Sequence, residues 1–244
     1  MLEGLYSAAS GMAAQQERLD ALSNDVANAN TPGYKARRVA FRDLVYERPG
    51  MGAGPAARVG AGAAATVIGA TDDQGALNQT GNPLDLAITG DGFFQVQRPN
   101  GTVGLTRDGS FHLDARGRIV TALGDEVSPG ITVPPGTDSS KISIAGDGTV
   151  SAAGNRLGKL AIVTVTAPDQ LQPIGRNQFA VTAGSGPARA TNKAVVQQSV
   201  LEDSNVDIGD AMSSMIDAQR SFQLASRAVQ MQDQMLEVAN GVKR

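Results

Sequence analysis

AMSSMIDAQRSFQLASRAVQMQDQMLEVA, residues 211–239, carries small and apolar side chains at steps that alternate between four and three. The positions of this stripe are Ala211, Met215, Ala218, Phe222, Ala225, Val229, Gln232, Leu236 and Ala239. Such alternating steps mark the a and d positions of a heptad repeat. The pattern therefore predicts a long helix with one narrow apolar face, and about 28 helical residues span roughly 40 Å.

The other end of the chain shows the same pattern. Its stripe consists of Leu2, Leu5, Ala9, Met12, Gln16, Leu19, Ser23 and Val26. Isolated helices are only marginally stable in water, and stripes this narrow bury little surface. We therefore expect the two terminal helices to pair with each other and with helices of neighbouring chains.

The stripes and the end of the first helix supply the candidate residues of an assembly interface. These are Leu5, Ala9, Met12, Leu19, Val26, Asn28, Met215, Phe222, Val229 and Leu236. The alternative is an ordinary helical hairpin packed on the rest of the protein. Charges in the second helix are few, and Ala, Ser and Gln fill its other faces. Helices of this composition can be approached closely on several sides, which favours a tightly packed assembly.

Between the helices, from about Leu84, the apolar period changes to two. Expected strands cover residues 85–88, 93–97, 103–106, 110–113, 118–121, 131–133, 141–144, 149–152, 159–166, 178–182 and 195–200. Asn-Gly and Asp-Gly pairs separate several of them, and such pairs favour tight hairpins. Many short strands with regular turns predict an antiparallel sandwich or a barrel-like domain.

The predicted fold class is α+β. Residues 1–35 and 205–244 form long terminal helices paired as a coiled-coil-like rod domain, residues 36–71 form an arm and a Gly/Ala-rich linker, and residues 72–204 form a central antiparallel β-rich domain. The first helix should end near Asn30, before Thr31-Pro32-Gly33. Asp207 and Asp210 should mark the start of the second helix, because carboxylates suit its free N–H groups.

Two alternatives remain open for each half of the arm and linker. The stretch from Tyr34 to Tyr46 fits either a short helix or an extended arm. Residues 47–70 are rich in Gly and Ala and fit a linker or loosely structured loop, or an extended segment that contact with other subunits orders.

Composition excludes several classes of function. Lys and Arg number 21 and Asp and Glu 24, a balance that predicts no polyanion or membrane attraction. The chain has no cysteine and only one histidine, so disulfides, thiolate chemistry and multi-histidine metal sites are excluded. Aromatic residues make up 4%, too few for a base-stacking platform, so we expect no nucleic-acid partner. No apolar run of about 18 residues occurs, so we expect no membrane insertion.

Polar residues in the middle of the chain give no catalytic, cofactor or metal site. Asp91, Asp108, Asp114 and Asp147 lie beside or near glycines, but Asp favours turns by bonding the local backbone, and no calcium-loop spacing is present. His112 should be an exposed strand residue between Phe111 and Leu113. We therefore expect a protein that is not an enzyme.

Three asparagines lie near the end of the first helix: Asn24, Asn28 and Asn30. Asparagine competes locally for backbone hydrogen bonds, so the cluster fits helix termination. It fits equally a polar lock between helices or subunits, comparable to a buried asparagine in a coiled coil.

Three segments resemble the flagellar rod and hook family of axial proteins. The first is LSNDVANANTPGYK at residues 22–35. The second is DLAITGDGFF at residues 85–94, followed by TRDGSF at 106–111. The third comprises SNV at 204–206, MIDAQRSF at 215–222 and DQML at 233–236. The three motifs occur in the family's order and cover most of the chain.

This resemblance implies a structural subunit of the bacterial flagellar basal body. Family members polymerise into a helical tube that transmits torque, with the terminal helices around the export channel and the β domain as an outer layer. The implied partners are copies of the same chain, other rod and hook subunits, and the flagellar export machinery. Export without a cleaved signal peptide agrees with the N-terminus, which carries Glu3 and no basic start.

Chain length and the DQML motif are most like subunits of the distal rod. Proximal rod subunits of similar length are the alternative. A third possibility, from another class, is a β-rich surface-binding module that its helices oligomerise.

Overall fold

The computed structural model describes residues 2–48, 57–191 and 193–241. The chain divides into two compact units. Unit 1 contains Met1–Ala27, Arg37–Ile68 and Asp207–Arg244, and unit 2 contains Asn28–Ala36 and Gly69–Val206. The chain therefore passes between the units at four points along its length.

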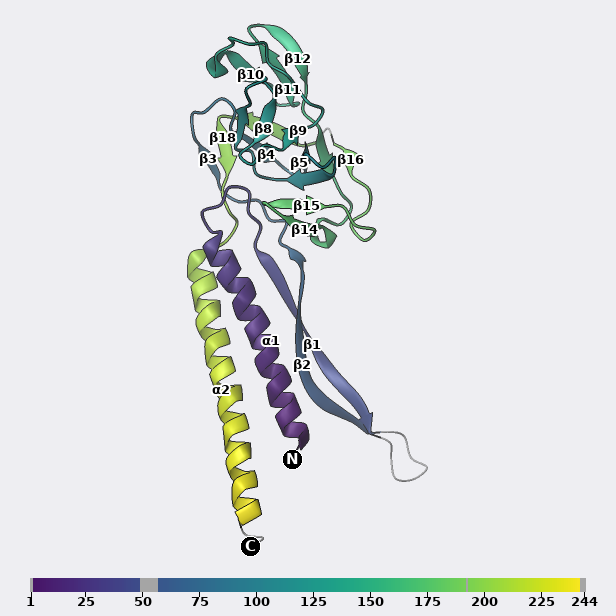
Figure 1. Cartoon of the computed structure of the whole chain (residues 1–244), viewed down its shortest axis with the longest axis vertical. Helices are drawn as coiled ribbons and strands as arrows, with labels where there is room; N and C mark the ends of the chain where they lie inside the picture. The colour runs from purple at the N-terminus through teal and green to yellow at the C-terminus, as the bar shows by residue number, and fades with distance from the viewer. Residues whose placement is uncertain (1, 49–56, 192, 242–244) are drawn as a thin grey trace. The chain divides into compact units, whose positions relative to one another are not determined.

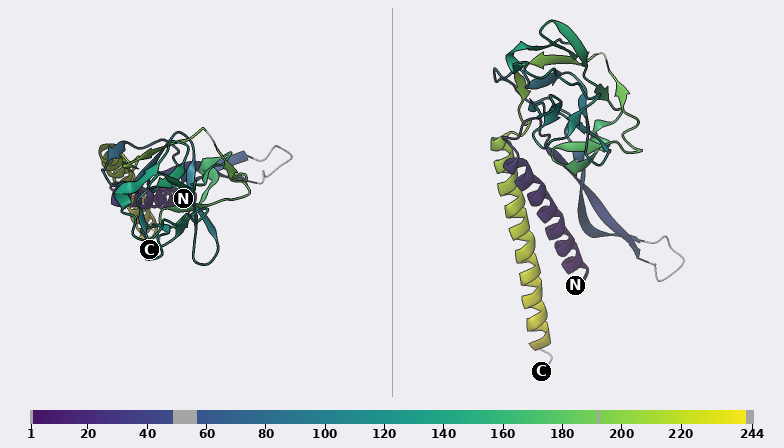
Figure 2. Two further views of the ribbon diagram at one scale, coloured as in Figure 1. Left: turned by 90° about the horizontal axis from the view of Figure 1, so that it is seen from above. Right: turned by 45° about the horizontal axis from the view of Figure 1, so that its top comes forward.

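Unit 1 is built on two long helices, α1 (Leu2–Ala27) and α2 (Ile208–Gly241). They lie side by side and run in opposite directions, as Figures 1 and 2 show. A Cβ atom placed on Gly4 would lie 3.2 Å from the side-chain amide of Gln232, so the first turn of α1 packs against the last turns of α2. The two long terminal helices predicted from the sequence are confirmed.

Local hydrogen bonds mark the C-terminal end of α1 and the N-terminal end of α2. We call these the inner ends of the helices, because the chain continues from them into unit 2. The N–H of Asp210 donates to Oδ1 of Asp207 at 3.0 Å, which confirms Asp207 as the cap of α2. Helix α1 ends at Ala27, slightly earlier than expected. The N–H of Thr31 then donates to the carbonyl of Asn28 at 3.0 Å, and Pro32 follows. Asn28 of the asparagine cluster thus lies in the turn that follows the helix, and its Oδ1 accepts the hydroxyl of Thr31 at 3.2 Å.

Unit 1 also contains a two-stranded ribbon formed by β1 (Arg37–Arg48) and β2 (Ala57–Ala70). The extended alternative for the arm is confirmed. The loosely structured loop or linker expected at residues 47–70 is wrong for residues 57–70, because β1 supplies a pairing partner for this segment. Residues 49–56 lie outside the described part of the chain.

Small residues let the ribbon approach α1 closely. The hydroxyl of Ser10 lies 3.3 Å from the carbonyl of Ala61, to which it donates. Gly62 has φ of +103°, and a Cβ there would collide with the Ser10 side chain. The Gly/Ala composition that suggested a linker therefore serves close packing of a strand on a helix.

Unit 2 is a β structure in which every pair of named strands is antiparallel. Its strands are β3 (Leu77–Gln79), β4 (Leu86–Thr89), β5 (Phe93–Gln97), β6 (Val103–Thr106), β7 (Phe111–Leu113), β8 (Ile119–Thr121), β9 (Glu126–Val127), β10 (Ile142–Ile144), β11 (Thr149–Ala152), β12 (Asn155–Lys159), β13 (Ile162–Thr164), β14 (Gln172–Gly175), β15 (Gln178–Ala180), β16 (Arg189–Ala190), β17 (Val195–Gln198) and β18 (Val200–Glu202). Short 3₁₀ turns occur at Ser139–Lys141 and Pro168–Gln170.

The largest sheet follows the order β14-β15-β6-β5-β9-β8-β7, and β13 joins β5 to β16. A three-stranded sheet, β10-β11-β12, and the pairs β17-β4 and β18-β3 complete the unit. The main core gathers side chains from most of these strands, and Phe94 packs edge-on against Phe111 with ring centroids 5.1 Å apart. An antiparallel β-rich centre is confirmed.

Apart from shifts of one or two residues at strand ends, three strand predictions differ from the structure. The single strand expected at 195–200 is divided at Ser199 into β17, which pairs with β4, and β18, which pairs with β3. Residues 131–133 form only an isolated bridge, between Arg118 and Thr132, although Ile131 and Val133 are buried as their alternation required. The single strand expected at 159–166 is divided into the end of β12 and β13. Leu160 lies between them and is buried in the main core, where the chain changes sheets.

Candidate assembly surfaces and a buried ionic junction

The predicted stripe of α2 lies on the less exposed side of that helix. Ala211 and Ala218 are buried, and Met215, Phe222 and Val229 are half-buried. The side chain of Leu236 lies outside the described residues. A helix of unit 1 therefore covers much of this stripe within the subunit itself.

The candidate residues of α1 differ more from one another in solvent exposure. Leu5, Met12, Leu19 and Val26 are half-buried, whereas Ala9 is exposed. Asn28 is half-buried and belongs to the loop that starts unit 2. The most buried positions of α1 are instead Ala14, Ala21 and Asp25.

Asp25 explains in part why the buried face of α1 differs from the predicted stripe. Its carboxylate accepts the backbone N–H of Arg37 at 3.1 Å, so the last turn of α1 holds the start of β1. A carboxylate needs such a partner when it is buried. The contact with the ribbon, which the sequence pattern does not encode, selects the face of α1 that is covered.

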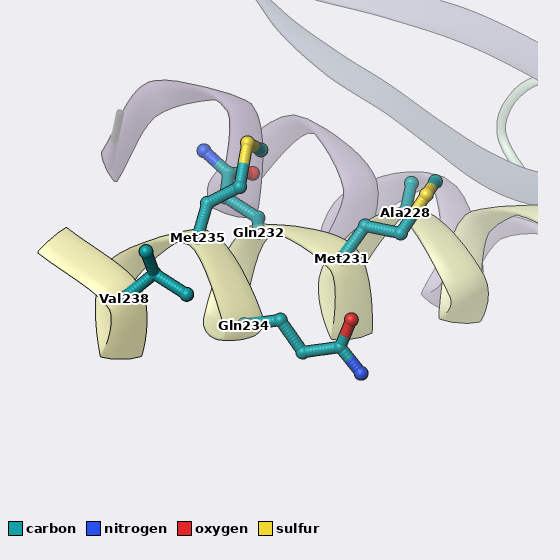
Figure 3. Close-up of a pocket in the computed structure, with 6 residues that line it drawn as sticks. All are labelled: Ala228, Met231, Gln232, Gln234, Met235 and Val238. Carbon is teal, nitrogen blue, oxygen red and sulfur yellow. The ribbon is translucent and has the colours of Figure 1, made fainter.

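A second apolar stripe runs along the C-terminal half of α2. It consists of Leu224, Ala228, Met231, Met235 and Val238, again at steps of four and three. All five are exposed, and Leu224, Met231, Met235 and Val238 are 65, 58, 60 and 67% exposed. A pocket on this surface is lined by Ala228, Met231, Gln232, Gln234, Met235 and Val238 (Figure 3).

The sequence analysis missed the second stripe, although continuing the search for heptad steps would have found it. Exposed apolar side chains grouped along one helix are typical of surfaces that bind another protein, often another helix. The C-terminal half of α2 therefore has two apolar faces, of which one remains exposed to solvent in the single chain.

Unit 2 contains a buried group of three charged side chains, Lys35, Arg107 and Glu202, here called the ionic junction. Nζ of Lys35 lies 2.6 Å from Oε1 of Glu202, and Arg107 lies 3.3 Å from Oε2. The three side chains are 3, 2 and 0% exposed. One carboxylate thus serves two cations.

Backbone groups bind most of the remaining donors and acceptors of the junction, whereas Nε of Arg107 is buried without a hydrogen-bond partner among the described residues. Lys35 donates to the carbonyl of Asp73 at 2.7 Å, and Arg107 donates to the carbonyl of Gly90 at 2.8 Å. The N–H of Gly75 donates to Glu202 at 3.0 Å. Buried ions are tolerated when they are paired and hydrogen-bonded in this way.

The junction was also missed, although its positions lie in or next to the quoted motifs. Lys35 ends the first motif, Arg107 lies in TRDGSF, and Glu202 comes two residues before SNV. Lys and Glu are rarely buried unless paired, but the sequence does not indicate which distant residue supplies the partner.

Three of the four acids in turns, Asp108, Asp114 and Asp147, bond local backbone, as expected from the sequence. The N–H of Thr149 donates to Asp147 at 2.9 Å and lowers the pKa of that carboxyl. The N–H of Arg118, the largest cause, lowers the pKa of Asp114 in the same way. Among the described residues, no group of three His, Cys, Asp or Glu side chains could hold a metal ion. His112 is exposed on β7, opposite Val120.

The described helices include none that is both long enough and apolar enough to cross a membrane. Paired terminal helices and an open apolar stripe indicate a protein that associates through helices. That is the class that the fold and its surfaces define.

Comparison with known proteins gives the family. Three family models match the chain: "Flagella basal body rod protein" at residues 5–35, "Flagellar hook protein FlgE/F/G D1 domain" at residues 87–152, and "Flagellar basal body rod FlgEFG protein C-terminal" at residues 197–242. The first and third models match α1 and α2, and the second matches unit 2.

Full-length relatives agree. The chain is 38% identical to the flagellar basal-body rod protein FlgG of Borreliella burgdorferi and 37% identical to the protein of the same name in Bacillus subtilis, with 100% of each chain covered. It is 31% identical to the flagellar hook-basal body complex protein FlhP of Bacillus subtilis, again over 100% of both chains. The chain belongs to the flagellar basal-body rod protein family.

Proposed function

We propose that the chain is a structural subunit of the flagellar basal-body rod. It polymerises with copies of itself into a helical tube that surrounds the export channel and transmits torque. The open apolar stripe on α2 carries this proposal, because a helix that already packs on α1 keeps a second face for a neighbour. The names of the full-length relatives support the same role.

In the polymer, α1 and α2 pack in a coiled-coil-like manner against helices of neighbouring subunits. The half-buried stripe residues Leu5, Met12, Leu19, Val26, Met215, Phe222 and Val229 join the helices within the subunit and extend to neighbours at their open edges. Ala9, Asn28 and Leu236 belong to the same proposed interface. Heptad spacing on both faces of one helix supports packing of this kind.

The proposed partners are further copies, other rod and hook subunits and the flagellar export machinery, which exports the chain without cleavage of a signal peptide. The proposed location is the basal body. Assembly is the whole of the proposed activity, without catalysis, cofactor, metal, nucleic acid or membrane insertion.

Within the family, we favour a distal rod subunit on chain length and on the DQML motif at residues 233–236. The proximal rod is the second candidate. Two of the matching family models name several hook and rod proteins together, so they fit a proximal as well as a distal subunit.

Deleting residues 2–27 tests the proposed function. This change removes α1 but leaves Lys35 and the rest of unit 2 in place. We expect non-motile cells with truncated basal bodies in electron micrographs, while the purified variant keeps the β circular-dichroism signal of unit 2. Normal rods and swimming would contradict the rod role and favour the surface-binding alternative.

A further inference from the structure

The ionic junction joins segments that are far apart in the sequence and close to the points where the chain passes between the units. Lys35 lies at the end of the segment 28–36, and Glu202 lies near the end of the segment 69–206. Their side chains meet across 167 positions of sequence. The junction itself lies wholly within unit 2.

Backbone hydrogen bonds extend this contact along both segments. The N–H of Gly33 donates to the carbonyl of Glu202 at 2.7 Å, and the N–H of Asn205 donates to the carbonyl of Tyr34 at 3.3 Å. The N–H of Ala36 donates to Oδ1 of Asn205 at 2.7 Å. Residues 28–36, here called the first connecting segment, are therefore held against residues 202–206, the last connecting segment. The hydrogen bonds lie on both sides of the ion pair.

Arg107 connects these segments to the core of the β unit. Its guanidinium donates to the carbonyls of Ile88 and Gly90, at 3.2 and 2.8 Å, and lies 5.4 Å from the ring centre of Phe93. These contacts hold Arg107 without help from either connecting segment. Glu202 binds this fixed cation with one oxygen and Lys35 with the other.

We propose that Glu202 is a positioning residue that holds the two connecting segments together in the unassembled subunit, and so keeps the inner ends of α1 and α2 on short tethers before the helices are ordered. From Gly33 back to Ala27, and from Glu202 forward to Ile208, each tether is only a few residues long. The proposal concerns the isolated subunit and does not depend on the proposed rod role.

Short tethers raise the concentration of one helix near the other. Besides the junction, other hydrogen bonds hold the segment 28–36 on unit 2: the side-chain amide of Asn177 donates to the carbonyl of Pro32, and the N–H of Thr71 donates to the carbonyl of Ala36, each at 2.8 Å. When loss of the junction lets these bonds open as well, the flexible connection between the helices grows from roughly a dozen to about fifty residues, which lowers their effective concentration by up to about tenfold.

Glu202→Gln is the principal test, made in the full-length chain. It keeps the shape of the side chain but leaves two buried cations without a carboxylate. Hydrogen exchange should speed up at least tenfold at the amides of Gly33 and Asn205, while amides of the β5–β6 pair keep their protection. Glu126→Gln is the matched control, because Glu126 pairs with Arg118 in the same unit but is 28% exposed. It should leave the amides of Gly33 and Asn205 unchanged.

Unchanged exchange at Gly33 and Asn205 in Glu202→Gln would overturn the proposal. So would equal loss of protection throughout unit 2, because Glu202 would then support the fold in general. If the Glu202→Gln variant does not fold, the Lys35→Met variant tests the proposal instead. It leaves the Arg107–Glu202 pair in place and should produce a smaller loss at the same two amides. No loss there, or a uniform loss, would again overturn the proposal.

The tether effect has its own measurement, because the chain contains no native cysteine. Gly4→Cys with Gln232→Cys places two thiols on neighbouring turns of α1 and α2. Their effective concentration, measured by disulfide equilibrium with glutathione, should fall by up to about tenfold when Glu202→Gln is added. An unchanged value would show that the junction does not bring the helices together.

Discussion

At the scale of single residues, Gly33 shows how a glycine can be required for two reasons at once. Its φ is +65°, in the left-handed region, and a Cβ atom there would lie 2.5 Å from the carbonyl carbon of Arg107. The first family motif therefore needs glycine both for its turn and for its close approach to the second motif.

Gly33→Ala should destabilise unit 2 by about 2–5 kcal/mol, since it adds the strain of positive φ to an overlap with backbone. Gly101→Ala is the matched control. Gly101 has φ of +81° but open space around a Cβ, so about 1–2 kcal/mol is expected. Urea unfolding of both variants measures the difference. Equal losses would mean that the contact with Arg107 carries no energetic weight.

Asp72 should respond to pH in the opposite sense to the turn acids. Asp72 is exposed, but loss of hydration beside the surrounding protein raises the pKa of its carboxyl above the usual 3.8, and the charges of Arg107 and Lys35 oppose this effect. Because the folded-state pKa is the higher one, ionisation costs stability, and that cost grows as pH rises through the folded pKa. Asp72→Asn should therefore raise the melting temperature at pH 7.

The gain from Asp72→Asn should shrink in acid, where the wild-type carboxyl is protonated as well. Asp147→Asn provides the opposite case, because the pKa of Asp147 is lowered in the folded protein. Its carboxylate stabilises the fold above about pH 4, and that contribution is lost as pH falls through the lower folded-state pKa. Thermal melts from pH 3 to pH 7 distinguish the two. A melting temperature at pH 7 that Asp72→Asn lowers would contradict the assigned sign.

At the scale of elements, helix α2 serves two neighbours with two different faces. The stripe that contains Phe222 is partly covered within unit 1, whereas the stripe that contains Met231 is open. Substitutions on the two faces should therefore have different consequences, although both faces consist of similar residues at the same spacing.

Phe222→Asp should weaken the helix pair itself. A carboxylate placed at this half-buried position loses hydration without gaining a partner, at a cost on the order of 1–3 kcal/mol. We expect loss of helical circular dichroism in the isolated subunit, failure to assemble, and an unchanged β unit. Normal rods built from this variant would show that Phe222 lies outside any packed interface.

Met231→Glu should leave the isolated subunit unchanged but prevent assembly, because the side chain is exposed until a neighbour covers it. Gln230→Glu is the matched control, since this neighbouring position is also exposed and belongs to neither stripe. Motility in soft agar and electron microscopy of basal bodies provide the measurement. If both variants swim normally, the second stripe is not an assembly surface.

At the scale of the whole molecule, unit 2 is not a continuous stretch of chain. It includes Asn28–Ala36, and its ionic junction needs Glu202, close to the end of the segment 69–206. Cutting the chain by sequence pattern alone, at residues 72 and 200, would remove Lys35 and Glu202 and leave Arg107 without its carboxylate.

A fragment of residues 69–206 should therefore melt at a higher temperature than one of residues 72–200. Loss of the carboxylate partner of a buried cation costs on the order of 3–5 kcal/mol, and β18 loses its last residues as well. Circular dichroism melts of the two fragments test this. A higher melting temperature for the shorter fragment would mean that the junction does not stabilise unit 2.

Sequence alone determined the features that depend on near neighbours. Heptad steps predicted both long helices, Asp207 predicted the start of α2, and period-two runs between Asp-Gly turns predicted strands such as Phe93–Gln97 and Val103–Thr106 without error. The quoted motifs indicated the family that the comparisons show. Helix and strand periods, caps and tight turns are set by residues a few positions apart, so a single sequence contains them.

Only the tertiary structure decided which faces are covered and which distant residues meet. It paired the Gly/Ala-rich segment 57–70 with β1, turned Ala14 and Ala21 rather than Ala9 inward, and joined Lys35 to Glu202 across 167 positions. These outcomes depend on contacts between segments far apart along the chain. A local pattern shows that a side chain needs a packing or hydrogen-bonding partner. Which residue supplies that partner is determined by the packing of the whole fold.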